Sequence, residues 1–200
     1  MQRSITHNRP KPEMNREQPH AGNLTGSLLV AHPSLNDPNF CRTIIFLSHH
    51  SAEDGAIGLI LNRPTGQLVE HITRVPGLDA SLRSVPVLAG GPVGTEDLLL
   101  ASIQWRTNPQ AVAFRGFGSL ESTDEIPAEF MNGLRVFRGY AGWSRGQLES
   151  EIAERAWLIT PPLRALIEIS DPERIWGDYL STLDPIFRLY AEAPDDPSLN

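Results

Sequence analysis

The strongest chemical signal in the sequence is a glycine-rich segment between a predicted strand and a predicted helix. Residues 139–146 read Gly-Tyr-Ala-Gly-Trp-Ser-Arg-Gly. Backbone N–H groups at the start of a helix can bind an anion, and a nearby arginine adds positive charge. The candidate ligand-binding residues of this segment are therefore Tyr140, Gly142, Trp143, Ser144 and Arg145.

The same segment also has a purely structural interpretation. Its glycine spacing is not the Gly-x-Gly-x-x-Gly of dinucleotide-binding loops. Ser144 stands three residues before Gln147, which is the spacing of a capping box and would use some of these N–H groups internally. If Gly142 has a positive φ, we expect its replacement by alanine to cost more than about 1 kcal/mol. Both interpretations stay open.

Two further turns supply candidates for anion recognition. Asn62 and Arg63 follow an apolar run, and a guanidinium can bind a carboxylate or phosphate through two parallel hydrogen bonds. Gly90 and Gly91 precede Pro92 in a tight turn, which lacks the Lys-Ser/Thr pair of a phosphate-binding loop. All four residues are retained as ligand-binding candidates.

Histidine, cysteine and carboxylate residues form no recognisable reaction centre. His49 and His50 are adjacent, so on a strand they would point to opposite faces, and we interpret them as solvated loop residues. Cys41 is expected to be a small buried residue rather than a nucleophile. The sequence has no His-Glu-x-x-His and no Gly-x-Ser-x-Gly motif. We therefore nominate no catalytic residue, no metal ligand and no cofactor. The expected solvated face of the helix after the glycine-rich segment carries Glu149, Glu151 and Glu154.

Composition limits the class of protein. The 200 residues carry 17 Lys and Arg against 24 Asp and Glu, a net charge of −7. Because this charge would repel phosphates, we expect no direct binding to nucleic acid. A single cysteine excludes an internal disulfide framework, and no run approaches the ~20 apolar residues of a membrane helix. A cytoplasmic protein without a membrane segment is expected.

Short apolar runs bounded by turn residues predict most of the elements. Strands are predicted at Leu28–Val30, Ile44–Leu47, Gly55–Leu61, Val85–Leu88, Leu98–Trp105, Ala111–Phe117, Arg135–Tyr140 and Trp157–Thr160. Ser48–Asp54 is expected to be a polar loop. Helices are predicted at Gln67–Arg74, Ile126–Leu134 and Ser144–Ala156, and from Asp171 onward. Within Ser144–Ala156 we expect an ion pair between Glu151 and Arg155.

This order of elements predicts the class and the boundaries of the fold. Strands and helices alternate irregularly, which favours an α+β fold: a single compact domain with a mixed β-sheet or partial barrel and several helices packed against it. The folded domain is expected over residues 23–190. Residues 1–22, which are polar and rich in proline, are predicted to be a disordered tail, and residues 191–200 a loose acidic tail.

Four segments in the same order along the chain resemble the AlgH-like (YqgE) family of bacterial proteins. The resemblance extends from about Asn23 to Leu183, and its segments are Leu35–Phe40 with Arg42-Thr43, Gly55–Pro64, Gly90–Val93, and Gly139–Trp143 continuing to Glu149. It implies a compact α+β domain of bacterial cytosolic type and implies no reaction. One namesake is linked to regulation of exopolysaccharide genes, which suggests an indirect role in transcription regulation.

Two hypotheses about function follow. The first is a non-catalytic binding or regulatory protein, in which the four motif turns, Asp37–Phe40, Asn62–Pro64, Gly90–Val93 and Tyr140–Gln147, converge to recognise a small anionic ligand or a protein partner. The alternative is an enzyme, a hydrolase or transferase, acting on a small anionic substrate held by Arg63 and the backbone of 142–146. The sequence leaves open whether the protein is an enzyme.

Overall fold

The computed structural model describes residues 22–73, 78, 80–120, 126–184, 186, 187 and 189. The predicted tails, residues 1–22 and 191–200, lie outside the described residues except for Gly22. Within the described part of the chain, no helix is both long enough and apolar enough to span a membrane.

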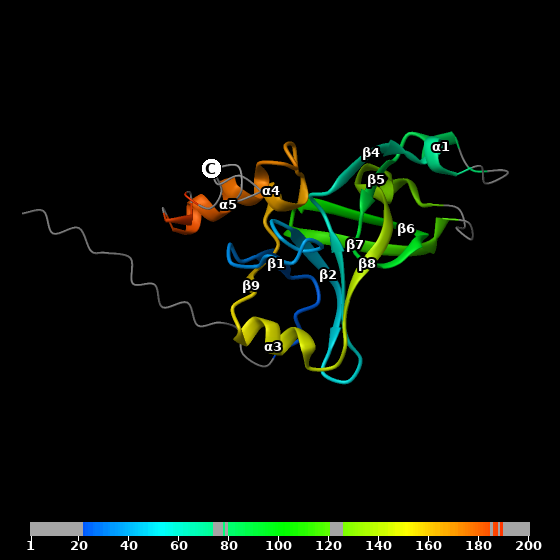
Figure 1. The fold of residues 1–200 in the computed structure, drawn as a ribbon. Coiled ribbons are helices and arrows are strands. Elements are labelled where there is room, and N and C mark those ends of the chain that lie inside the picture. The colour runs from blue at the N-terminus through cyan, green and yellow to red at the C-terminus, as the bar shows by residue number, and fades with distance from the viewer. Residues whose placement is uncertain are drawn as a thin grey trace, which may run out of the picture.

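The fold is a curled mixed sheet with helices at its margins (Figure 1). The strands are β1 Leu28–Ala31, β2 Ile44–Ser51, β3 Gly55–Ile60, β4 Pro64–Leu68, β5 Pro86–Ala89, β6 Val93–Thr107, β7 Gln110–Ser119, β8 Leu134–Trp143 and β9 Trp157–Thr160. The helices are α1 Val69–Ile72, α2 Ala80–Arg83, the 3-10 helix η2 Ala128–Gly133, α3 Gln147–Ala153, α4 Arg164–Ile167 and α5 Ile175–Leu183. The predicted α+β class is confirmed.

Strand β8 is the centre of the sheet because it pairs with three neighbours. Its first half runs parallel to β5 and antiparallel to β6, and its end at Ala141–Trp143 pairs antiparallel with β3. The sheet continues from β3 through β2 and β1 to β9, and β7 lies beyond β6. Gly139, with φ 67°, lies between the two halves of β8, opposite a register shift in β6. The change of neighbours at this point lets the sheet curl.

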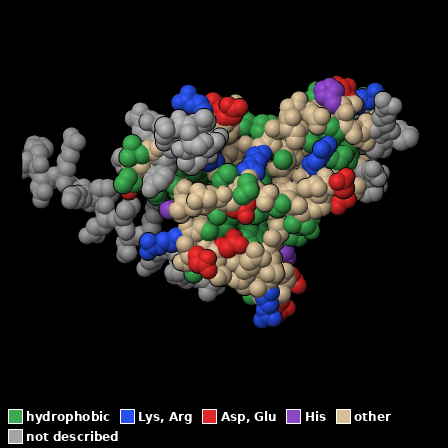
Figure 2. All heavy atoms as spheres, viewed as in Figure 1, with side chains coloured by type: hydrophobic (Ala, Val, Ile, Leu, Met, Phe, Trp, Pro, Cys, Tyr) green, Lys and Arg blue, Asp and Glu red, His purple; other side chains and the backbone are tan. Residues whose placement is uncertain are grey.

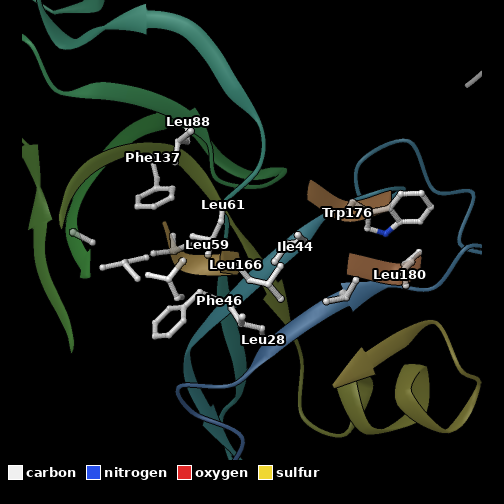
Figure 3. Close-up of a cluster of buried hydrophobic side chains, with 14 residues drawn as sticks. Leu28, Ile44, Phe46, Leu59, Leu61, Leu88, Phe137, Leu166, Trp176 and Leu180 are labelled. Atoms are coloured by element: carbon white, nitrogen blue, oxygen red, sulfur yellow. The ribbon is translucent and has the colours of Figure 1, made fainter. Parts of the chain in front are cut away.

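The direction of the curl follows from two aromatic rings. Phe46 on β2 and Phe114 on β7 are separated in the sheet by β3, β8 and β6, yet their ring centroids are 5.1 Å apart. The face that carries both rings is therefore the concave face. Its buried cluster includes Leu59, Phe137 and Leu166 of α4 (Figure 3). On the opposite face, Leu148 of α3 packs in a second cluster with Trp143 and Trp157.

Several element boundaries differ from the sequence predictions. β2 continues to Ser51, so the predicted loop Ser48–Asp54 is reduced to a tight hairpin, because the backbone of β2 pairs with β3 up to Gly55. The predicted helix Gln67–Arg74 is strand β4 followed by a single helical turn, and Arg74 lies outside the described residues. The predicted helix Ile126–Leu134 is the 3-10 helix η2, and α5 begins at Ile175, four residues after Asp171.

Candidate functional site

The side chain of Arg63 holds the turn at residues 37–41 in place. Its Nη1 donates to the carbonyl oxygen of Asn39 at 2.7 Å, and its Nη2 donates to the carbonyl oxygens of Pro38 and Cys41 at 3.2 and 3.0 Å. The half-buried thiol of Cys41 lies 4.0 Å from the same Nη2. These backbone carbonyls therefore use the donors that the sequence hypothesis assigned to an anion.

Asn62 is also bonded within the fold. Its amide oxygen accepts from the backbone N–H of Ile44 at 2.8 Å, and its amide nitrogen donates to the carbonyl oxygen of Arg42 at 2.9 Å. The side chain is buried. Since both ends are satisfied, Asn62 fastens the strand end at residue 62 to the start of β2.

Gly90 and Gly91 allow the backbones of two motif turns to touch. A Cβ atom at Gly91, where φ is 154°, would lie 2.1 Å from the carbonyl carbon of Tyr140, and a Cβ at Gly90 would lie 2.2 Å from the carbonyl oxygen of Gly139. Only glycine fits such an approach. The backbone N–H of Ala89 in turn donates to the carbonyl of Arg63 at 2.9 Å, so these turns form one connected unit.

The Trp143 side chain is buried against Trp157 and Phe40. The indole Nε1 groups of Trp143 and Trp157 both donate to Oε2 of Glu151, at 2.9 and 2.7 Å. The Phe40 ring stacks on Trp143 with a centroid separation of 6.2 Å. This arrangement, which we call the Glu151 clasp, joins the first motif turn to α3. It corrects two predictions: Glu151 is not a solvated residue, and it does not pair with Arg155, which lies beyond α3 with φ 61°.

His50 is likewise not a solvated loop residue. It is buried on β2, its Nδ1 accepts the backbone N–H of Leu24 at 3.0 Å, and its Nε2 lies 2.9 Å from Oε1 of Glu149. The neutral tautomer with its proton on Nε2 satisfies both bonds. A hydrogen bond from its own backbone N–H lowers the pKa of Glu149, and the bond from His50 acts in the same direction, while burial opposes them.

The remaining candidates of the glycine-rich segment lie at the start of α3. The side-chain oxygen of Gln147 accepts both the backbone N–H and the hydroxyl of Ser144, each at 3.1 Å, which is one half of the predicted capping box. Arg145 is exposed. Gly142 does not have a positive φ, so the condition for a costly alanine substitution is not met.

Three of the six exposed large apolar side chains among the described residues lie on the concave face; the other three are Leu163, Ile186 and Leu189. Ile57, Val93 and Phe114 are 42%, 40% and 37% exposed, although large apolar side chains of this sheet are otherwise mostly buried. Ile57 pairs across the sheet with Gly142, and Val93 pairs with Tyr140, whose ring covers the space above Gly142. We call Ile57, Val93, Phe114 and Tyr140 the concave-face patch. Figure 2 shows hydrophobic side chains exposed in the middle of this view, over the strands.

One partly buried charge also lies on the concave side. Arg135 on β8 is paired across the sheet with Ala101, and its Nη2 donates to the carbonyl oxygen of Ile167 in α4 at 2.5 Å. Its Nη1 is buried without a hydrogen-bond partner. Burial lowers the pKa of Arg135, and the carboxylate of Glu168 partly opposes this. The sequence signal for this residue was a lone arginine within the apolar run Leu-Arg-Val-Phe at residues 134–137.

Comparison with known proteins places this geometry in a family. The model of the AlgH-like family matches residues 28–187. The chain belongs to the AlgH-like family. A UPF0301 protein of Streptomyces avermitilis is 39% identical over 191 residues, covering 88% of this chain and 95% of that protein. A UPF0301 protein of Streptomyces coelicolor is 38% identical over 193 residues, with the same two coverages. The resemblance inferred from the four motif segments is confirmed.

Two solved structures share the fold of this AlgH-like chain. A protein from Corynebacterium diphtheriae has a TM-score of 0.62 at 22% identity, covering 94% of this chain and 95% of that one. The AlgH protein from Pseudomonas aeruginosa has a TM-score of 0.56 at 26% identity, covering 90% of this chain and 99% of that one. The fold is thus shared with two proteins whose sequences differ from this chain at about three quarters of positions.

Proposed function

We propose that the protein is a non-catalytic binding protein that recognises a protein partner through the concave-face patch. The proposal includes a cytoplasmic location and an indirect role in transcription regulation, both suggested by the family resemblance. Tyr140 and Gly142, two of the candidates chosen from the sequence, belong to or border this patch. The other candidates act in the proposal by shaping the scaffold that presents it.

The proposal rests on the contrast between polar side chains that are bonded within the fold and apolar side chains that remain exposed. Polar side chains of the motif turns bond within the fold, as Arg63 and Asn62 show. The apolar side chains of Ile57, Val93 and Phe114 instead remain partly in water on one face. Apolar groups gathered on an exposed face favour association, since their burial removes them from water.

The charges near the patch indicate the chemistry of the partner. Glu96 and Asp97 are exposed on β6 next to Val93, and the carboxylate of Asp97 lies beside Gly94, close to the Tyr140 ring. The whole chain carries a net charge of −7, which would oppose pairing with a second copy. The proposed partner segment is therefore apolar at its centre and basic where it meets Glu96 and Asp97.

Site-specific photo-crosslinking in cells tests this proposal. A photoreactive amino acid at position 57 should give a discrete adduct, and the same probe at position 163 should not, because Leu163 is 38% exposed but lies outside the patch. The substitution Val93→Lys should abolish the adduct from position 57 while leaving the melting temperature unchanged within about 2 °C. Equal adducts from positions 57 and 163, or an adduct insensitive to Val93→Lys, would refute the proposal.

A further inference from the structure

The guanidinium of Arg135 is incompletely bonded in an otherwise satisfied interior. Among the described residues, Nη1 of Arg135 is the one buried side-chain nitrogen or oxygen atom that has no hydrogen-bond partner. An arginine stays protonated in proteins, so this end of the side chain carries charge and two N–H donors. A buried donor left unbonded costs about 1–3 kcal/mol, which makes an acceptor from outside the chain favourable.

The surroundings of Arg135 supply no acceptor for Nη1. Ala101 and Phe137, on its concave side, belong to the apolar cluster. The carbonyl of Ile167 accepts from Nη2, the other branch of the guanidinium. The carboxylate of Glu168 is close enough to influence Arg135, but it accepts a hydrogen bond from Nε of Arg164 at 2.7 Å.

We propose that the end of the Arg135 guanidinium, enclosed by β8, β6 and α4, binds the carboxylate group of a small ligand. A carboxylate oxygen accepts the N–H groups of Nη1, which converts an orphaned donor into a charge-assisted hydrogen bond. The site is separate from the concave-face patch, because Arg135 and Tyr140 stand five residues apart on β8, about 16 Å along the strand.

The local charge selects a carboxylate over a phosphate. Arg135 and Arg164 carry two positive charges and Glu168 one negative charge, so the group is positive by a single charge. A carboxylate monoanion neutralises this charge. Phosphate carries more than one negative charge near neutral pH and would leave an uncompensated negative charge beside the partly buried Arg135.

Thermal unfolding of the full chain with acetate tests the site, using sodium chloride of equal ionic strength as the reference. Acetate should raise the melting temperature of the wild type in a saturable way. The variant Arg135→Gln should bind acetate at least about tenfold more weakly. Arg138→Gln, which removes an exposed arginine from the same strand, should respond like the wild type.

Backbone amide chemical shifts provide a second readout that does not depend on stability. Acetate should shift the amide signals of Ala101, Phe137 and Ile167 in the wild type and in Arg138→Gln. If Arg135→Gln does not fold, Arg135→Lys, which lacks the branched donor, should show the same loss of acetate binding. An absent acetate effect in the wild type would show that Nη1 is bonded only to trapped water and would overturn the proposal. A stronger response to inorganic phosphate than to acetate, or an unchanged response in both Arg135 variants, would overturn it as well.

Discussion

Replacing Glu151 with alanine removes the acceptor shared by two buried tryptophans. Trp143 and Trp157 are 4% and 3% exposed, so their indole N–H groups would have little access to water. Leaving a buried donor unbonded costs about 1–3 kcal/mol, and the two bonds here are to a charged group. We therefore expect the free energy of unfolding to fall by roughly 2–4 kcal/mol. For a chain of this size, the melting temperature would fall by roughly 4–16 °C.

The assay is urea unfolding followed by tryptophan fluorescence and by far-ultraviolet circular dichroism. Glu154→Ala is the matched control, because Glu154 is exposed at the end of the same helix and accepts a hydrogen bond from the hydroxyl of Ser150. The control should change the free energy of unfolding by less than about 0.5 kcal/mol. Glu151→Gln keeps one oxygen acceptor for the indoles and should give an intermediate loss. If Glu151→Ala and Glu154→Ala unfold at the same urea concentration, the Glu151 clasp does not stabilise the fold.

Three further predictions concern the motif turns and the response to pH. Arg63→Ala should lower the free energy of unfolding by about 1–3 kcal/mol, because three backbone carbonyls lose a charged donor; a urea midpoint equal to that of the wild type would contradict this. Gly91→Ala should cost more than about 3 kcal/mol, because the added Cβ would lie 2.1 Å from a backbone carbon, whereas Gly142→Ala, with its nearest atom at 3.3 Å, should cost less than about 1 kcal/mol. Thermal melting that ranks these two variants in the opposite order would refute the steric argument. The pKa of His32 is lowered by burial and then by Arg155, and the pKa of Glu149 is also lowered, so stability should decline as the pH falls below 6.5 and again below 4.5; a melting temperature that stays flat from about pH 7 to pH 5 would exclude the His32 contribution, and one that stays flat from about pH 5 to pH 3 would exclude that of Glu149.

The fold was predictable where local sequence and tertiary structure agree. The run Ile44–Leu47 and the run Trp157–Thr160 are apolar, lie between turn residues and form strands as expected. Ser144 and Gln147 have capping-box spacing, and the side chain of Gln147 does accept the N–H of Ser144. In these segments the local pattern and the packing require the same conformation.

The predictions were wrong where the deciding partner is distant in sequence. Residues 48–51 are polar and resemble a loop, but hydrogen bonds to β3 extend β2 through them. The carboxylate of Glu151 lies on the polar side of an amphipathic pattern, and only the arrangement of β8 and β9 on either side of α3 brings both indoles to it. Long-range pairing of this kind leaves no periodicity in the sequence.

The candidate site was predictable only in part, because several of its contacts also join residues that are distant in sequence. Gly90 and Gly91 were recognisable as a tight turn, and the close approach of their backbone to β8 explains why glycine is needed. Arg63 could be recognised as a multiple donor, but its acceptors are carbonyls of a turn more than twenty residues earlier. The concave-face patch could not be predicted, since its members come from β3, β6, β7 and β8 and face one another only after the sheet curls.

The most direct test of the central claim compares the photo-crosslink from position 57 in two folded variants. Val93→Lys changes the concave-face patch, whereas Arg63→Lys changes a motif turn and keeps its charge. If the motif turns shape the scaffold and the patch recognises the partner, the adduct is lost in Val93→Lys and retained in Arg63→Lys. If the adduct is instead retained in Val93→Lys and lost in Arg63→Lys, this account is contradicted and the binding site lies at the motif turns.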